Sequence, residues 1–243
     1  MNEIMEKTLS QMRAIRITSI AAKLEEMAAD PNFSLRSADD VLAELFAYEY
    51  NKRMSKRIQD GLKNSNLKYK AATLDSTLNE PDRKIDVNAV NALSECKWID
   101  SRSNLLITGK TGTGKTYLGC ALGISAIHKS KSVLYTKAST MINNLSDLSR
   151  QGEYSVGLET YTKPELLIID DFGLMSLDIE RCLHMFEVLD AREGNGSVMV
   201  ISQLPVKAWY ELFQSNVYAD SCLSRLTGKA LRLELDGRDM RKS

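Results

Sequence analysis

The chain has 243 residues, enough to bury a sizeable core as one α/β domain with a smaller part attached. Basic and acidic residues both number 32, so the formal net charge is zero and any affinity for nucleic acid must come from local patches. The four cysteines form no Cys-x-x-Cys pair, which argues against zinc and redox sites, and no apolar run is long enough to span a membrane. We therefore expect a cytoplasmic protein with small, buried cysteines and no membrane partner.

The first 70 residues are predicted to form a small helical domain. Apolar residues from Met5 to Met27 recur near helical spacing until Pro31, which predicts a first helix. Ser37 precedes two aspartates and an apolar face that continues to Tyr50, as expected of an N-cap and a second helix. We place this domain at residues 1–70 and a nucleotide domain at 71–243, in which residues 79–82 are predicted to form a turn and 85–99 a short helix.

The second helix becomes strongly basic towards its end. Residues 52–70 contain seven cations and one carboxylate in a chain that is neutral as a whole. Lys52 and Lys56 are four residues apart, as are Arg53 and Arg57, so these cations lie on adjoining helix faces suited to following phosphates. A solvated helix end whose cations favour the helix dipole explains the same pattern, so sequence alone leaves both interpretations open.

A P-loop pattern follows an apolar run that begins at Asn104. Gly109-x4-Gly114-Lys115-Thr116 stands between a predicted strand and a helix-compatible run, the context that distinguishes a phosphate site from a glycine-rich turn with an incidental lysine. Glycines and a helix N-terminus direct backbone N–H groups at phosphate oxygens. We expect Lys115 to reach the β and γ phosphates and Thr116 to ligate Mg²⁺. The predicted nucleotide-binding residues are Gly109, Lys110, Thr111, Gly112, Thr113, Gly114, Lys115, Thr116 and Tyr117.

Strand and helix patterns alternate from residue 104 onward. The predicted strands are 105–108, 132–136, 165–170 and 197–201, and the predicted helices are 115–128, 137–150 and 179–189. Short strands without internal polar residues are typical of parallel strands covered on both faces. The predicted fold is an α/β doubly wound parallel sheet of the P-loop NTPase type, with ligands at the carboxyl ends of the strands.

Paired carboxylates end the predicted strand at 165–170. Leu166-Leu-Ile-Ile-Asp170-Asp171 matches a Walker B pattern, so we expect Asp170 to organise Mg²⁺ and Asp171 to orient and activate the attacking water. An aspartate is shorter than the glutamate common at this place, and small positioning errors cost rate, so we expect slow hydrolysis unless the protein is assembled. An acidic turn at a strand end is the weaker explanation because a P-loop precedes it on the same α/β pattern.

Two further side chains are candidates for the same site. Gln203 follows the strand at 197–201 and could bond the γ-phosphate or the water, although an ordinary turn before Pro205 fits equally well. Arg225 is expected late in a short helix, where it could neutralise charge on a neighbouring subunit's phosphate. A surface salt bridge accounts for Arg225 just as well from sequence alone.

With these residues assembled, the chain resembles the IstB family of AAA+ ATPases, helper proteins of an insertion-sequence transposase that are related to the DnaC helicase loaders. The resemblance implies that Gln203 is sensor 1 and Arg225 an arginine finger, so that Lys115, Asp171, Gln203 and Arg225 form the catalytic set. A helical lid is expected to be reduced or absent, leaving Arg241 as the candidate for sensor 2. The stretches that carry the resemblance are residues 49–57, 73–75, 98–99, 109–116, 167–173, 202–205 and 224–235.

The family further implies ATP and Mg²⁺ as cofactors and ATP-dependent assembly of a homo-oligomer on double-stranded DNA, which is remodelled for a transposase. Three alternatives stay open on sequence alone. A DnaC-type loader would hold a helicase and single-stranded DNA, and a nucleotide-gated scaffold would hydrolyse little ATP. A small-molecule kinase would need an acceptor site closed by an arginine-rich lid, and no insertion after residue 116 resembles one.

Overall fold

The computed structural model describes residues 3–78, 85–237 and 239, which form two compact units divided after Gln59. The contacts thus separate Met1–Gln59 from Asp60–Ser243, whereas a functional domain boundary near residue 70 remains a prediction. The turn expected at residues 79–82 and the sensor 2 candidate Arg241 lie outside the described residues.

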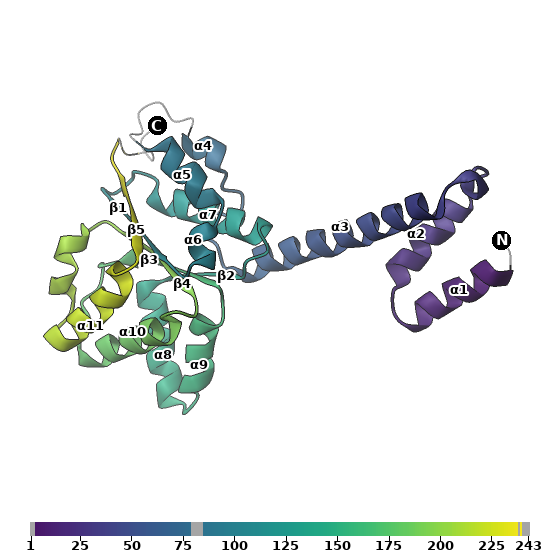
Figure 1. Ribbon diagram of the computed structural model, residues 1–243. Helices are drawn as coiled ribbons and strands as arrows, with labels where there is room; N and C mark the ends of the chain where they lie inside the picture. The colour runs from purple at the N-terminus through teal and green to yellow at the C-terminus, as the bar shows by residue number, and fades with distance from the viewer. Residues whose placement is uncertain (1–2, 79–84, 238, 240–243) are drawn as a thin grey trace. The chain divides into compact units, whose positions relative to one another are not determined.

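The N-terminal unit is helical and has a small core of its own (Figure 1). The expectation of one helix from Met5 to Met27 is wrong, because Arg16 takes a left-handed backbone with φ 63° and divides that stretch. The N-cap expected at Ser37 is confirmed, since the Asp40 N–H donates to the Ser37 hydroxyl at 3.1 Å. The elements are α1 (Glu3–Ala14), α2 (Thr18–Ala28), the 3₁₀ turn η1 (Phe33–Leu35) and α3 (Ala38–Asn64), which continues past the unit boundary. The buried residues of the core are Leu9, Ala21, Leu24, Met27 and Leu45.

The second unit is built on a five-stranded, all-parallel sheet in the order β2-β3-β4-β1-β5. Its strands are β1 (Asn104–Gly109), β2 (Val133–Lys137), β3 (Leu166–Phe172), β4 (Ser197–Ser202) and β5 (Ala230–Leu235). Its helices are α4 (Leu74–Leu78), α5 (Val87–Ser94), α6 (Lys97–Asp100), α7 (Lys115–His128), α8 (Ala138–Arg150), α9 (Tyr154–Thr162), α10 (Ile179–Arg192) and α11 (Asn216–Thr227). Two 3₁₀ turns, η2 (Val206–Ala208) and η3 (Tyr210–Leu212), precede α11. The doubly wound α/β fold predicted from the sequence is confirmed.

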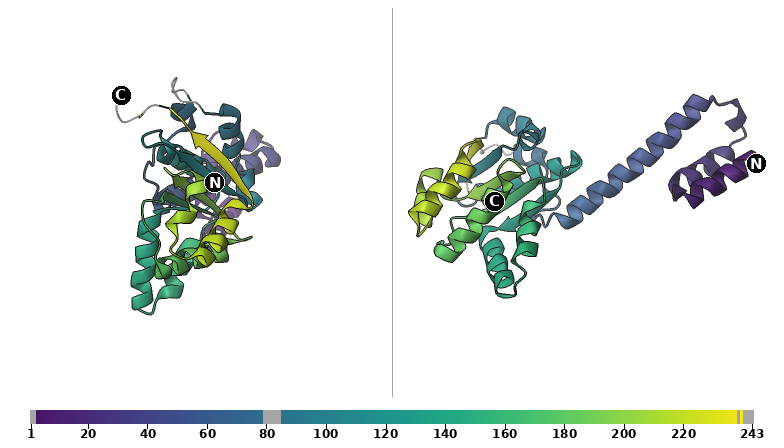
Figure 2. Two further views of the ribbon diagram at one scale, coloured as in Figure 1. Left: turned by 90° about the vertical axis from the view of Figure 1, so that its left-hand side faces the viewer. Right: turned by 60° about the horizontal axis from the view of Figure 1, so that its bottom comes forward.

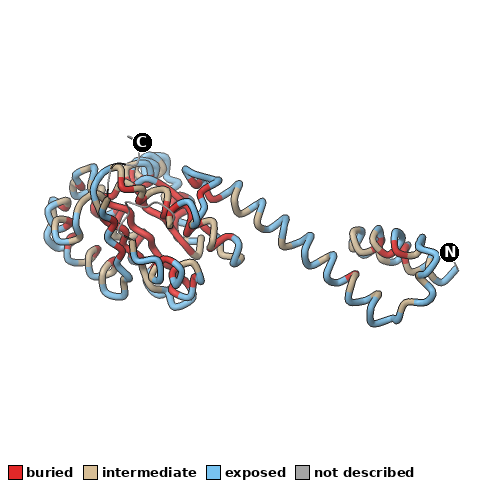
Figure 3. The backbone as a smooth tube through the Cα atoms, turned by 90° about the horizontal axis from the view of Figure 1, so that it is seen from above, coloured by how far each residue is buried: buried red, intermediate tan, exposed pale blue. Residues whose placement is uncertain are grey.

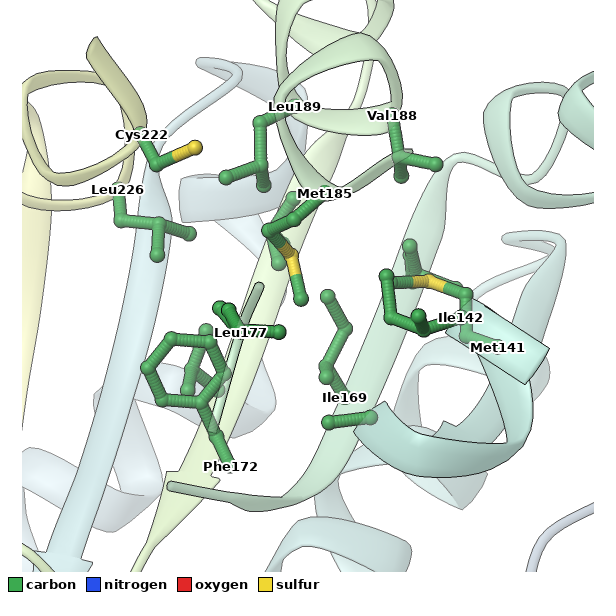
Figure 4. Packing of buried hydrophobic residues seen from close by; sticks show 14 of the residues in the cluster. Met141, Ile142, Ile169, Phe172, Leu177, Met185, Val188, Leu189, Cys222 and Leu226 are labelled. Atoms are coloured by element: carbon green, nitrogen blue, oxygen red, sulfur yellow. The ribbon is translucent and has the colours of Figure 1, made fainter. Parts of the chain in front are cut away.

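Helices cover both faces of this sheet (Figure 2), and its strands are buried as a result (Figure 3). On one face α7 packs so closely that a Cβ on Gly123 would touch the Ile168 side chain at 3.0 Å. Figure 4 shows the other face, where Met141 of α8, Met185 of α10 and Leu226 of α11 belong to one buried cluster with Ile169 of β3. Alternate residues of one strand thus serve opposite faces, which explains the continuous apolar runs.

The predicted segment at 85–99 contains a break. Cys96 has φ 60° and separates α5 from α6, so this stretch forms two short helices where the sequence pattern suggests one. Asp86 caps α5 by accepting the Ala89 N–H at 3.1 Å.

All four cysteines, Cys96, Cys120, Cys182 and Cys222, are buried and free, as expected of small hydrophobic residues. Burial raises the pKa of the Cys96 thiol to about 11 and that of the Cys222 thiol to about 12. Among the described residues, no helix has the length and apolar composition needed to cross a bilayer.

Candidate nucleotide-binding site

The predicted P-loop connects the end of β1 to the start of α7. Gly112 and Gly114 have φ of 84° and 81°, left-handed conformations that residues with a Cβ rarely adopt. Lys115 is buried to 6% exposure at the first position of α7, and its Nζ donates to the carbonyl of Lys110 at 2.6 Å. The loop therefore turns back on its own lysine, with the N-terminus of α7 beneath it.

A β-bulge at the end of β3 presents the two carboxylates. Ile169 pairs with Val200 and Phe172 pairs with Ser202, so Asp170 and Asp171 together oppose a single residue of β4. Asp171 has φ 56°, a left-handed conformation that is uncommon for residues other than glycine. Neighbouring residues of a regular strand point to opposite faces, and the bulge re-aims this pair.

Asp170 of β3 is hydrogen-bonded both to the P-loop helix α7 and to the edge strand β2. It is 2% exposed, and its Oδ2 accepts hydrogen bonds from the Thr116 hydroxyl at 2.9 Å and the Tyr135 hydroxyl at 2.6 Å. Burial and the bond to Asp170 both raise the pKa of Tyr135, so the phenol keeps its proton. Tyr135 was not singled out from the sequence, because only the register of β2 against β3 places it here.

Asp171 is paired with a lysine that was not singled out from the sequence either. Nζ of Lys137, the last residue of β2, lies 2.8 Å from Asp171 Oδ2. The hydrogen bond to Asp171 raises the pKa of Lys137, so the ion pair persists at neutral pH. The carboxylate expected to activate water is thus held by a cation from the neighbouring strand.

Gln203 lies beside the P-loop. Thr111 donates its hydroxyl proton to Gln203 Oε1, which connects the residue after β4 to the loop after β1. The backbone bends at Gln203 and Leu204 before Pro205, and this bend does not prevent the amide from reaching the site.

Residues of the P-loop, together with Asp170, Asp171 and Gln203, line a cleft of about 440 Å³, which is within the usual range for small-ligand sites. Away from the phosphate loop, the rings of Tyr69 and Tyr117 have centroids 5.6 Å apart, and Lys68 Nζ lies 5.4 Å from the Tyr69 centroid. The Tyr117 hydroxyl accepts the Thr73 N–H at 3.2 Å. From the sequence, Lys68 was grouped with the basic residues of the helical domain and Tyr69 was missed, since no local pattern marks it.

Arg225 lies apart from all these residues, at the end of the sheet where the strands begin. Its carbonyl accepts a hydrogen bond at 2.8 Å from the side chain of Asn104, the first residue of β1. The P-loop begins at the other end of the same strand. The Arg225 guanidinium pairs with Asp190 at 2.5 Å and Glu193 at 3.2 Å. With Arg102, Arg192 and Lys229, Arg225 lines a second cleft of about 400 Å³ where β1, β4 and β5 begin.

The four cations considered for DNA contact lie on α3 in the N-terminal unit, and all four are exposed. Arg53 pairs with Glu49 at 2.6 Å, and Lys52 Nζ lies 5.9 Å from the Tyr48 ring centroid. Lys56 and Arg57 follow one turn further along the helix.

Comparison with known proteins decides the family of this chain. The family model described as IstB-like ATP binding protein matches residues 10–243. The chain belongs to this family. A relative from Sinorhizobium fredii, described as an ATP-binding protein of an insertion sequence, is 33% identical over 97% of this chain and 94% of its own length. Another from Pseudomonas fluorescens is 34% identical over 82% of this chain and 87% of its own length.

Solved structures show the same fold as the α/β unit of this IstB-like chain. The DnaC helicase loader matches with a TM-score of 0.57 and 17% identity over 68% of this chain and 97% of that chain. DnaA from Aquifex aeolicus bound to AMPPCP matches with a TM-score of 0.52 and 20% identity over 63% of this chain and 47% of that chain. The doubly wound P-loop fold expected from the resemblance is thereby confirmed.

Proposed function

We propose that this IstB-like protein is an ATPase helper of transposition that assembles as an oligomer on double-stranded DNA, remodels it and recruits a transposase. Its family binds ATP, and its relatives from Sinorhizobium and Pseudomonas are described as insertion sequence proteins. The arrangement of Lys115, Asp170, Asp171 and Gln203 around one cleft supports ATP hydrolysis at this site.

The donor set fits ATP with Mg²⁺. The left-handed glycines and the N-terminus of α7 suit phosphate oxygens, and Lys115 lies within the loop. The oxygens of Thr116 and Asp170, 2.9 Å apart, are the hard ligands that Mg²⁺ prefers. The metal would supply charge neutralisation on the phosphates. Asp171 then holds and activates water, and Gln203 orients the water or the γ-phosphate.

The position of Arg225 is the observation that most supports the proposed oligomer. Arg225 is held at the end of the sheet where the strands begin, while the other catalytic candidates lie at the end where the strands finish. A six-residue strand spans about 20 Å, too far for an arginine side chain to cross. We therefore infer that Arg225 serves the cleft of a second copy, where its guanidinium would exchange Asp190 and Glu193 for that copy's phosphates.

A mixing experiment tests this arrangement. Lys115→Ala and Arg225→Ala are each expected to abolish most ATP hydrolysis, because each removes one half of a shared site. Mixing the two variants on duplex DNA should restore hydrolysis, since the intact cleft of Arg225→Ala can then meet the intact arginine of Lys115→Ala. Phosphate release and sedimentation are measured for each variant and for the mixture. Arg150→Ala, which removes an exposed arginine paired with Asp147 on α8, is the matched control.

If the mixture sediments as an oligomer and still does not exceed the single variants in phosphate release, a shared site would be contradicted. Unchanged ATP-dependent assembly of Lys115→Ala would contradict ATP control of the oligomer. If phosphate release stayed at background while ATP still drove assembly of the wild type, the protein would be a nucleotide-gated scaffold.

The DNA partner is tested through α3. Replacing Lys52, Arg53, Lys56 and Arg57 by alanine should weaken duplex binding and reduce the slope of log affinity against log salt by up to about four, because each of these cations would neutralise about one phosphate. Lys163→Ala with Lys207→Ala, two exposed cations of the second unit, should leave the slope unchanged. Tighter binding of single-stranded than duplex DNA at one stated salt concentration would favour a helicase loader.

A further inference from the structure

Asp170 is held by three donors that fix both of its oxygens. Oδ2 accepts the hydroxyl protons of Thr116 and Tyr135, and Oδ1 accepts the Asp171 N–H at 2.8 Å. Thr116 is itself expected to bind the metal, and the Asp171 N–H belongs to the bulge. Tyr135 is therefore the side-chain donor to Asp170 that has no other role in the proposed reaction.

The sheet register explains how Tyr135 reaches this carboxylate. Lys137 is paired with Asp170 and Tyr135 with Ile168, so Tyr135 is the diagonal neighbour of Asp170 on the same face. A tyrosine is long enough to span that diagonal, and a shorter polar side chain is not. The result is a 2.6 Å hydrogen bond to an oxygen that also faces the P-loop helix.

The backbone of Tyr135 is fixed as firmly as its side chain. β2 is an edge strand, and on its outer side the Tyr135 N–H donates to the carbonyl of Ser65 at 2.7 Å. Ser65 is fully buried directly after α3, and its own N–H bonds to Gly61 at 2.9 Å. The backbone that carries the phenol is thus bonded on both sides, to Ser65 and to β3, which gives the rigid support that a metal-binding carboxylate needs.

We propose that Tyr135 is a positioning residue for the metal site: its hydroxyl fixes Asp170 so that this carboxylate and the Thr116 hydroxyl face one Mg²⁺. The inference rests on the proposed binding of ATP with Mg²⁺. It predicts that the phenol oxygen acts on metal affinity, whereas the ring serves packing. Buried phenols elsewhere in the fold should have no such effect.

The test is Tyr135→Phe in the full chain, which removes one oxygen and keeps the ring. Binding of Mn²⁺ in the presence of AMPPCP, followed by electron paramagnetic resonance, should weaken roughly ten- to hundredfold. Binding of a fluorescent ATP analogue without divalent metal should stay unchanged, because the phosphate loop is untouched. Excess Mg²⁺ should restore the rate of ATP hydrolysis.

The matched control is Tyr161→Phe. Tyr161 and Tyr135 are both 7% exposed, and the Tyr161 hydroxyl bonds to Asn144 at 3.2 Å, away from the cleft. This variant should retain wild-type Mn²⁺ affinity. In an Asp170→Asn background, Tyr135→Phe should cause no further loss of Mn²⁺ affinity, because its effect passes through that carboxylate.

Mn²⁺ affinity of Tyr135→Phe within twofold of the control would overturn the proposal. An equal loss of metal-free nucleotide binding would overturn it too, since the hydroxyl would then support the whole cleft. The Mn²⁺ measurement needs no turnover. A wild type that binds Mn²⁺ without releasing phosphate would therefore contradict the proposed hydrolysis while the role of Tyr135 is still decided.

Discussion

Gly109 is the residue at which the end of the sheet and the phosphate loop constrain each other most tightly. It has φ 145°, and a Cβ built on it would overlap the carbonyl oxygen of Leu235, its partner in β5. Gly109→Ala should therefore open the end of the β1–β5 ladder and shift the loop. We expect a loss of roughly 1–3 kcal/mol of unfolding free energy from backbone strain alone, and at least tenfold weaker ATP binding. Urea unfolding and fluorescent nucleotide titration measure the two effects.

Gly152→Ala separates strain from crowding. Gly152 also has a left-handed φ, 76°, but no atom lies within 4 Å of an added Cβ. Gly152→Ala should lower the free energy of unfolding by about 1–2 kcal/mol and leave nucleotide binding intact. Equal nucleotide affinity in the two variants would show that the contact with Leu235 does not shape the loop.

Lys137 is predicted to restrain hydrolysis in the unassembled protein. Its ion pair with Asp171 is partly exposed, so releasing it should free the carboxylate at a gain of about two- to fivefold in rate. Lys137→Met should show this increase in phosphate release without DNA, at saturating ATP, with unchanged nucleotide affinity. Because Asp171 raises the Lys137 pKa above its ordinary 10.5, mild alkali should not produce the same increase in the wild type. A rate equal to that of Lys163→Met, an exposed lysine outside the cleft, would contradict this restraint.

At this scale the sequence predicted the residues that form local patterns. The phosphate loop and the pair at Asp170 are contiguous in the chain, and Gln203 follows directly after its strand. Tyr135 and Lys137 could not be predicted, because their roles depend on the register between β2 and β3, which pairs residues more than thirty positions apart. The left-handed turn at Asp171 likewise follows from the bulge against β4.

Among the elements, α10 ends in a buried cation that holds the beginnings of two strands together. Arg192 is 1% exposed and donates to the carbonyls of Tyr161, Pro164 and Ser197 at 2.8, 2.9 and 2.7 Å. Burial lowers its pKa to about 10, with a smaller contribution from the charge of Arg102. The residue thus joins the end of α9 to the start of β4 through polar contacts.

Arg192→Met should destabilise the second unit by roughly 2–4 kcal/mol, because several buried carbonyls lose their donor. The urea midpoint of the full chain measures this loss. Arg181→Met, which removes a partly exposed arginine of the same helix, should change stability by less than about 0.5 kcal/mol. Equal midpoints would mean that water satisfies the carbonyls just as well.

Elements with a continuous apolar pattern were predicted well, and those with weaker patterns were not. α7 runs from Lys115 to His128 as expected, and α8 differs by one residue at its start. β5 was missed although Ala230-Leu-Arg-Leu-Glu-Leu235 alternates apolar and polar residues, the pattern of a half-buried strand, because the prediction followed the continuous apolar runs of strands covered on both faces. The breaks at Arg16 and Cys96 were missed because left-handed residues other than glycine leave little local signal.

For the whole molecule, the division after Gln59 predicts that the second unit folds without the first. Residues 60–243 include the sheet, its helices and all the residues that line the cleft. This fragment should bind ATP within about twofold of the full chain and lose most of its affinity for duplex DNA, because the cations of α3 are removed. Nucleotide titration and DNA binding at one salt concentration test both statements. Duplex affinity equal to that of the full chain would move the DNA-binding surface to the second unit.

The buried thiols described above can also report where the structure opens locally. Cys96 lies between α5 and α6, Cys120 in α7 behind the phosphate loop, Cys182 in α10 and Cys222 in α11. A thiol reagent can reach each sulfur only when the structure around it opens, so labelling rates followed by mass spectrometry rank the local opening of three helices and of the junction between α5 and α6 in the unmodified protein. ATP should slow labelling at Cys120 first, since α7 carries the phosphate loop. Any partner that binds to α11 should slow labelling at Cys222.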